Sequence, residues 1–147
     1  MIAACVGAST RGSRFCWRPG RRGTGTTQLG KILAHAQREN DSKKVGALVF
    51  VGDAFEESLD AVCAAAGKLG LSGIPALIFQ EADDQVCEQA FREIARLSRG
   101  AYCRFAPGAA DELGQLLRAA AAYAAGGVKA LEARHGRGAA TLLEQLK

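Results

Sequence analysis

The segment Val45–Asp53 (VGALVFVGD) constrains the fold more than any other part of the chain. It is a run of branched and aromatic apolar residues that is too short for a helix, with Lys43–Lys44 before it and Gly52–Asp53 at its end. A continuous apolar run of this length is typical of a parallel strand that is covered on both faces. Open α/β sheets bind ligands at the carboxyl ends of such strands, so Asp53 is the first candidate for a functional residue.

The rest of the chain alternates between two hydrophobic patterns. Apolar residues spaced three and four apart predict helices, and short apolar runs between them predict strands. The predicted helices cover about residues 27–39, 56–69 and 84–98, with a fourth after Pro107–Gly108, and the predicted strands cover 45–51, 74–79 and 101–105. Strands and helices that alternate in this way form a parallel sheet with right-handed crossovers. We therefore expect an α/β fold of three layers, doubly wound and Rossmann-like, with a mostly parallel sheet and helices on both faces.

The two ends of the chain differ from this central part. Residues 1–23 carry five arginines and no acidic residue, whereas the remaining part is close to neutral. Apart from a short possible strand over 2–6, this head shows no periodicity, and its SRFCWRP stretch reads as a poor strand, so we expect a poorly ordered basic segment. Its composition also fits a transit peptide or a basic arm. We expect an α/β domain over 24–125 and a helical tail over 126–147, which glycines interrupt and which packs loosely or projects.

Composition excludes several classes of protein. No segment approaches the roughly 18 consecutive apolar residues of a membrane helix, and the nearly neutral body argues against a nucleic-acid footprint spread across the fold. The five cysteines form no CxxC pair, and their odd number argues against a fully paired disulfide framework. A reducing cytoplasm is the simplest compartment for such a chain.

Five segments, taken in order, resemble the later part of a von Willebrand factor A domain. They are TTQLGKIL (26–33), LVFVGDAFEE (48–57), GIPALIFQ (73–80), FREIARLSRGAYCRF (91–105) and DELGQLL (111–117). The resemblance extends from about residue 24 to residue 125. It implies the fold expected above and a role in binding other proteins.

The family generally holds a divalent cation at a metal-ion-dependent adhesion site built by three loops at the carboxyl edge of the sheet. By resemblance, Thr27 matches the threonine of the second loop and Asp53 the aspartate of the third. The Asp-x-Ser-x-Ser motif of the first loop is absent, and Gly7–Arg11, its nearest counterpart, has glycine for the aspartate and arginine for the second serine. The chain therefore looks like a domain whose N-terminal strands are missing or replaced. Since magnesium needs about six oxygen ligands, we expect no bound metal or weakly bound Mg²⁺.

Other readings of the same residues stay open. Asp53 and Thr27 could each cap the helix that follows them. The negative charges of Glu56 and Glu57 would be stabilised by the positive N-terminal end of the second helix. The Gly20–Thr27 turn (GRRGTGTT) partly matches the phosphate-binding pattern Gly-x4-Gly-Lys-Ser/Thr, with a threonine at the lysine position. A glycine-rich turn before a helix can still accept an anion, and its candidate residues are Gly23, Gly25, Thr26 and Thr27.

The sequence thus favours a non-catalytic module that binds an unidentified protein. No nucleophile lies near a base in the sequence, so an enzyme is not expected. A strand edge left exposed by the missing first third could pair with a second copy of the chain. The alternative is a nucleotide- or phosphate-binding α/β protein that uses the Gly20–Thr27 turn. Nucleic-acid binding through the arginine-rich head is a weaker third hypothesis.

Overall fold

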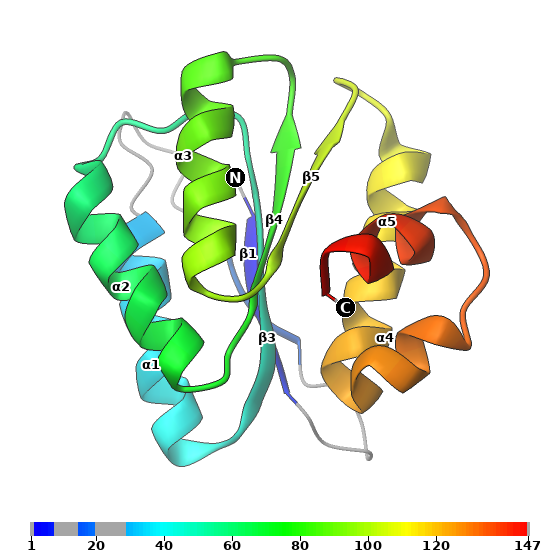
Figure 1. Cartoon of the computed structure of the whole chain (residues 1–147), viewed down its shortest axis with the longest axis horizontal. Coiled ribbons are helices and arrows are strands. Elements are labelled where there is room, and N and C mark those ends of the chain that lie inside the picture. The colour runs from blue at the N-terminus through cyan, green and yellow to red at the C-terminus, as the bar shows by residue number, and fades with distance from the viewer. Residues whose placement is uncertain (1, 8–14, 20–28, 147) are drawn as a thin grey trace.

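The computed structural model describes residues 2–7, 15–19 and 29–146, with side chains over 29–146 (Figure 1). Its strands form one sheet in the order β2-β1-β3-β4-β5. The strands are β1 (Ile2–Gly7), β2 (Phe15–Pro19), β3 (Val45–Gly52), β4 (Ala76–Glu81) and β5 (Ala101–Phe105). The helices are α1 (Leu29–Ser42), α2 (Leu59–Leu71), α3 (Gln85–Leu97), α4 (Ala110–Glu132) and α5 (Arg137–Leu146).

Helices cover both faces of the sheet and give the three layers predicted from the sequence (Figure 1). Strands β3, β4 and β5 are parallel to one another. Helices α1, α2 and α3 pack on one face, and the chain then crosses to the other face with α4 and α5. The predicted α/β fold with its parallel strands is confirmed.

The N-terminal part of the sheet differs from the rest because its strands are antiparallel. β1 runs antiparallel to β3, with Ile2 opposite Val51 and Gly7 opposite Val45. β2 then pairs with β1 over Phe15–Pro19, so the interpretation of this stretch as a poor strand is wrong. A proline is tolerated there because β2 is an edge strand. The side of β3 that was expected to be exposed is therefore covered, and the sheet ends at β2.

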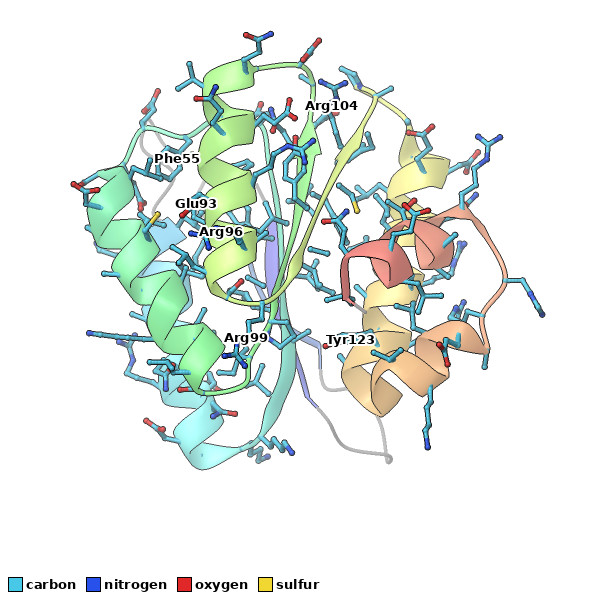
Figure 2. The ribbon with its side chains drawn as sticks, in the orientation of Figure 1. Phe55, Glu93, Arg96, Arg99, Arg104 and Tyr123 are labelled. Carbon is cyan, nitrogen blue, oxygen red and sulfur yellow. The ribbon has the colours of Figure 1, made fainter. Side chains whose placement is uncertain are left out.

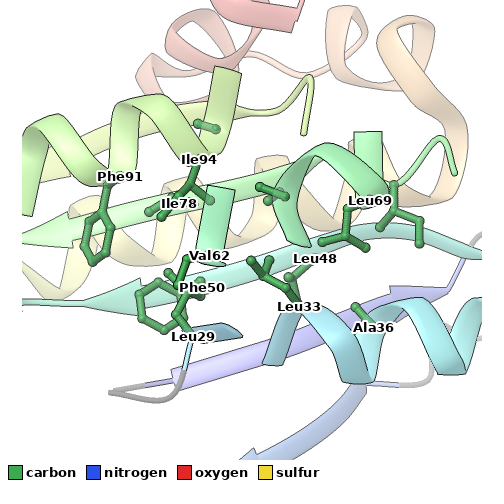
Figure 3. Packing of buried hydrophobic residues seen from close by; sticks show 14 of the residues in the cluster. Leu29, Leu33, Ala36, Leu48, Phe50, Val62, Leu69, Ile78, Phe91 and Ile94 are labelled. Carbon is green, nitrogen blue, oxygen red and sulfur yellow. The ribbon is translucent and has the colours of Figure 1, made fainter. Parts of the chain in front are cut away.

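Two apolar clusters fill the spaces between the layers. One lies between the sheet and α1–α3, where Phe50 and Phe91 pack edge to face with ring centroids 5.5 Å apart (Figure 3). The other lies between the sheet and α4–α5. Because the strands supply both clusters, their sequences are almost wholly apolar, as the run Val45–Val51 indicated.

The predicted start of the second helix is wrong by about three residues. α2 begins at Leu59, and Ser58 is the residue that precedes its first turn. Leu59 is 42% exposed because it lies at the very start of the helix. Glu56 and Glu57 consequently belong to the loop after β3 and not to the helix.

The tail was expected to pack loosely, and this prediction is wrong. α4 continues past residue 126 to Glu132, with a kink at Gly127, whose φ of 68° is one that glycine adopts without strain. α5 then folds back against α4 and β5, and Leu142 is fully buried. Gly138 permits this approach, since a Cβ there would come within 2.9 Å of the Gln115 backbone of α4.

Candidate functional site at the carboxyl edge of the sheet

The three parallel strands end at the same edge of the sheet, and Asp53 lies there directly after β3. Its side chain is exposed, as expected for a group that meets a ligand. The alternative in which Asp53 caps the following helix is wrong, because α2 begins six residues later and Ser58 holds that position. The Asp53 loop is anchored by Phe55, whose ring packs edge to face on Phe91 of α3 with centroids 6.1 Å apart (Phe55 is labelled in Figure 2).

A hydrogen bond joins this loop to the beginning of α1. The Gly30 backbone N–H donates to Glu57 Oε2 at 2.9 Å. The first amides of a helix lack partners within the helix and carry partial positive charge, so a carboxylate is a favourable acceptor there. Glu57 was expected to interact with the N-terminal end of the second helix. It accepts a hydrogen bond from the first turn of α1 instead. The two residues are 27 positions apart, and no local sequence pattern reports this contact.

The other predicted site residues lie outside the described part of the chain. These are Thr27 of the cation site and Gly23, Gly25 and Thr26 of the anion alternative. The described chain resumes at Leu29, two residues after Thr27, where α1 begins beside the Asp53 loop. Whether Thr27 meets Asp53 therefore stays a prediction.

The described residues do not by themselves form a metal centre. Within 29–146, no group of three or more His, Cys, Asp or Glu side chains could hold a metal ion. The negative charge of Asp53 acts on Cys87 in the first turn of α3. Burial, together with the charges of Asp84 and Asp53, raises the pKa of the Cys87 thiol to about 11. One carboxylate falls far short of the oxygen ligands that magnesium requires.

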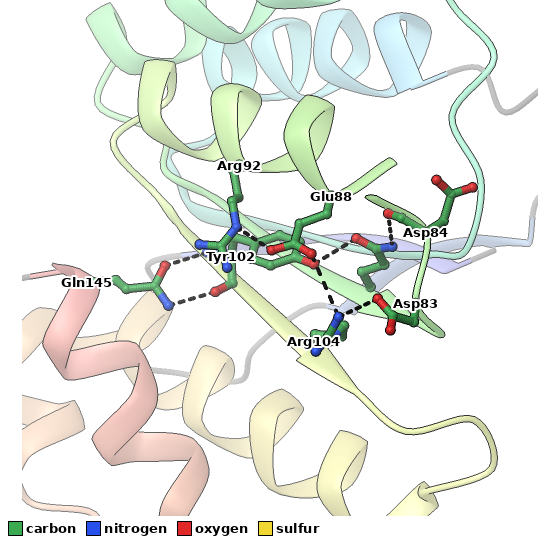
Figure 4. A network of polar contacts seen from close by, with 8 residues as sticks. Asp83, Asp84, Glu88, Arg92, Tyr102, Arg104 and Gln145 are labelled. Carbon is green, nitrogen blue, oxygen red and sulfur yellow. Dashed lines mark hydrogen bonds and ion pairs between the residues drawn. The ribbon is translucent and has the colours of Figure 1, made fainter. Parts of the chain in front are cut away.

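A buried polar network lies behind this edge and ties β4, β5 and α3 together (Figure 4). Gln80 of β4 is fully buried, and its Oε1 accepts a hydrogen bond from the Tyr102 hydroxyl at 2.7 Å. Gln80 Nε2 donates to the Asp84 backbone carbonyl at 3.1 Å. Asp84 Oδ1 accepts from the Val86 and Cys87 amides and so caps α3. Because each buried polar group finds a partner, the network is structural.

Ion pairs extend the network towards solvent. Arg104 Nη1 lies 2.6 Å from Asp83 Oδ1 and 3.7 Å from Glu88 Oε2. Arg92 Nε pairs with Glu88 Oε1 at 2.7 Å, and the Arg92 guanidinium stacks over the Tyr102 ring, 4.7 Å from its centroid. Exposed pairs of this kind contribute only about 0–1 kcal/mol each. They set the positions of side chains at the edge more than they stabilise the fold.

A shallow pocket of about 350 Å³ opens beside Arg104. Its residues come from the end of β4, the end of β5 and the start of α4, namely Ala82, Asp83, Arg104, Phe105, Ala106, Pro107 and Glu112. Two carboxylates hold its loop: the Gly108 amide donates to Glu81 Oε1, and the Ala106 amide donates to Glu112 Oε2. The pocket offers a surface for contact and no nucleophile.

The described thiols are poor nucleophiles. Burial raises the pKa of Cys103 to about 11, and burial together with the Glu93 and Asp60 charges raises that of Cys63. Since the thiolate is the reactive form, a raised pKa makes each thiol inert near neutral pH. The imidazole of His35 on α1 could act as a base, but its Nε2 lies 3.7 Å from Glu39 Oε1 of the same helix.

The comparisons with known proteins give no further support. No family model, curated protein or solved structure matches the chain. In the described segments, no helix has both the length and the apolar character needed to cross a membrane.

Proposed function

We propose that the chain is a non-catalytic protein-interaction module of the von Willebrand factor A type with an incomplete metal-ion-dependent adhesion site. One observation carries this proposal. The hydrogen bond from the Gly30 amide to Glu57 brings the first turn of α1 beside the loop that carries Asp53. In the family, the threonine and the aspartate of the adhesion site come from these two places, and here they correspond to Thr27 and Asp53.

The site is incomplete because the first of its three loops, which carries the Asp-x-Ser-x-Ser motif in the family, has no counterpart here. The strand that lies beside β3 is β1, which runs antiparallel, so its carboxyl end lies at the opposite edge of the sheet. Gly7 therefore lies at the end of the sheet away from Asp53. A single hydroxyl and a single carboxylate would leave magnesium mostly hydrated and weakly bound.

A catalytic role has less support. The thiols of Cys63, Cys87 and Cys103 all have raised pKa values and stay protonated at neutral pH. The buried polar groups Gln80 and Tyr102 are hydrogen-bonded to each other and are not directed at a substrate. What remains at the edge is a surface for binding. The five cysteines form no CxxC pair and are odd in number, and on this ground we place the module in the cytoplasm.

The partner is a protein, and one candidate is a second copy of the chain paired through an edge strand of the sheet. The two edge strands of the sheet, which have a neighbouring strand on one side only, are β2 and β5. Exposed edges present unpaired N–H and C=O groups and favour such pairing. Light scattering at high protein concentration measures self-association directly. A dimer would support pairing with a second copy, and a strict monomer would contradict it.

Calorimetric titration with Mg²⁺ and Mn²⁺ tests the incomplete adhesion site. We expect little heat from the wild type, with a dissociation constant no tighter than about millimolar, because ligands are missing. Asp53→Ala is the test variant, and Asp60→Ala, an exposed acid in the first turn of α2, is the control. Tight stoichiometric binding that Asp53→Ala abolishes and Asp60→Ala preserves would contradict the proposal.

The alternative, nucleotide or phosphate binding by Gly20–Thr27, faces one obstacle in the structure. The Gly30 amide at the start of α1 is already occupied by the Glu57 carboxylate, which would repel an incoming anion. A thermal-shift screen with nucleotides, with and without magnesium, separates the two functions. Stabilisation by a nucleotide, and not by metal alone, would favour the alternative.

A further inference from the structure

In the described part of the chain, the side chain of Gln145 hydrogen-bonds to the outer edge of β5. The Gln145 side chain reaches from the last turn of α5 to the backbone of Tyr102 (Figure 4). The Tyr102 N–H donates to Gln145 Oε1 at 2.7 Å, and Gln145 Nε2 donates to the Tyr102 carbonyl at 2.6 Å. The side-chain amide thus makes the same pair of hydrogen bonds that a peptide group of a neighbouring strand would make.

These contacts lie on the side of β5 that faces away from β4. β5 is the last strand of the sheet, and its other side pairs with β4 from Ala101 to Phe105. The N–H and C=O of one residue point to the same side of a strand, and the side alternates from residue to residue. The backbone N–H and C=O of Tyr102 point away from β4, so those of Arg104, two residues later, point to the same side. An edge of this kind is a template for another strand.

We propose that Gln145 closes the β5 edge and that this edge, once opened, pairs with the β5 strand of a second copy of the chain. The inference rests on the proposed function as an interaction module and names the edge that the module keeps closed. Because Gln145 blocks β5 in the native chain, native self-association would have to use the other edge strand, β2.

The sequence of β5 is suited to pairing with itself. An antiparallel pair related by a twofold axis at Cys103 sets Tyr102 of one copy opposite Arg104 of the other. Both residues present outward backbone groups, so the pair forms four backbone hydrogen bonds. Arg104 then faces an aromatic ring, and no like charges lie directly opposite each other. The second copy therefore fits this edge by symmetry and by charge.

The test removes the amide and measures two quantities. In Gln145→Ala we expect the Tyr102 amide to exchange its hydrogen at least about tenfold faster at low protein concentration, because it has lost its acceptor. At high concentration we expect the average mass from light scattering to rise from that of the wild-type species to twice its value. Glu144→Ala, an exposed neighbour on the same turn, is the control and should change neither quantity.

A second variant shows whether the new contact uses β5. Proline lacks an N–H and blocks pairing at an edge strand. Adding Arg104→Pro to Gln145→Ala should return the mass to the wild-type value. If the wild type already forms a dimer that Arg104→Pro leaves intact, that dimer uses β2, and Gln145→Ala should then form larger assemblies. A Gln145→Ala protein with an unchanged mass and unchanged Tyr102 exchange overturns the inference while leaving the proposed function standing.

Discussion

Tyr102 takes part in several interactions of the polar network through its hydroxyl, its backbone and its ring. Its hydroxyl donates to buried Gln80, its backbone pairs with Gln145, and its ring lies under the Arg92 guanidinium. Burial, together with the Glu88 charge, raises the pKa of its phenol to about 12, so the hydroxyl stays a donor at all ordinary pH values. Tyr102 is thus a structural residue that holds β4, β5 and α5 in register.

The Tyr102 hydroxyl should be needed for stability. Tyr102→Phe leaves Gln80 Oε1 buried without its donor, and this should lower the free energy of unfolding by about 1–3 kcal/mol. Urea denaturation measures the change. Tyr123→Phe is the matched control, because the structure gives that half-buried hydroxyl no hydrogen-bond partner among the described residues, and its effect should stay within about 0.5 kcal/mol. Equal effects of the two substitutions would refute the role of the Gln80–Tyr102 bond.

Part of the site could be predicted residue by residue. The third helix was predicted to begin at about residue 84, and Asp84 does cap α3 through the Val86 and Cys87 amides. The position of Asp53 after a buried strand placed it at the carboxyl edge. The contact of Glu57 with Gly30 could not be foreseen, because it depends on how two helices pack side by side and not on local spacing.

At the scale of elements, the C-terminal tail is the clearest difference between expectation and structure. Glycines at 136 and 138 suggested an interrupted, loosely packed segment. In the fold, Gly138 instead lets α5 approach α4 closely, and Leu142 fills the space between α5 and the sheet. A glycine that permits close packing and one that breaks a helix look alike in a sequence.

If α5 belongs to the core, truncating its buried leucine must be costly. Leu142→Ala removes a fully buried side chain, and we expect a loss of about 2–5 kcal/mol of unfolding free energy. Leu71→Ala is the control, since that leucine at the end of α2 is 87% exposed and its truncation should cost less than about 0.5 kcal/mol. Equal free energies of unfolding for the two variants in urea denaturation would contradict a role of α5 in the core and would indicate a loosely attached tail.

At the scale of the whole molecule, the alternation of strands and helices was sufficient to predict three layers around a parallel sheet. The possible strand over 2–6 is confirmed as β1, whereas β2 was not predicted, because its sequence FCWRP lacks the strong apolar runs of β3 and β4. Their pairing is a tertiary effect: the open side of β3 offers unpaired backbone groups, and the head supplies partners for them. This arrangement covers the strand that the family resemblance left exposed.

The adhesion-site assignment depends on one proximity, that of Thr27 to Asp53. A disulfide between Thr27→Cys and Asp53→Cys measures it most directly, since such a bond forms only where the Cα atoms lie within about 4.4–6.8 Å. Thr27→Cys with Asp111→Cys, on α4 at the far side of the same edge, is the control pair. After mild oxidation and peptide mapping by mass spectrometry, we predict a 27–53 disulfide in most molecules and no 27–111 disulfide. Absence of the 27–53 disulfide, or equal amounts of both, would contradict the assignment.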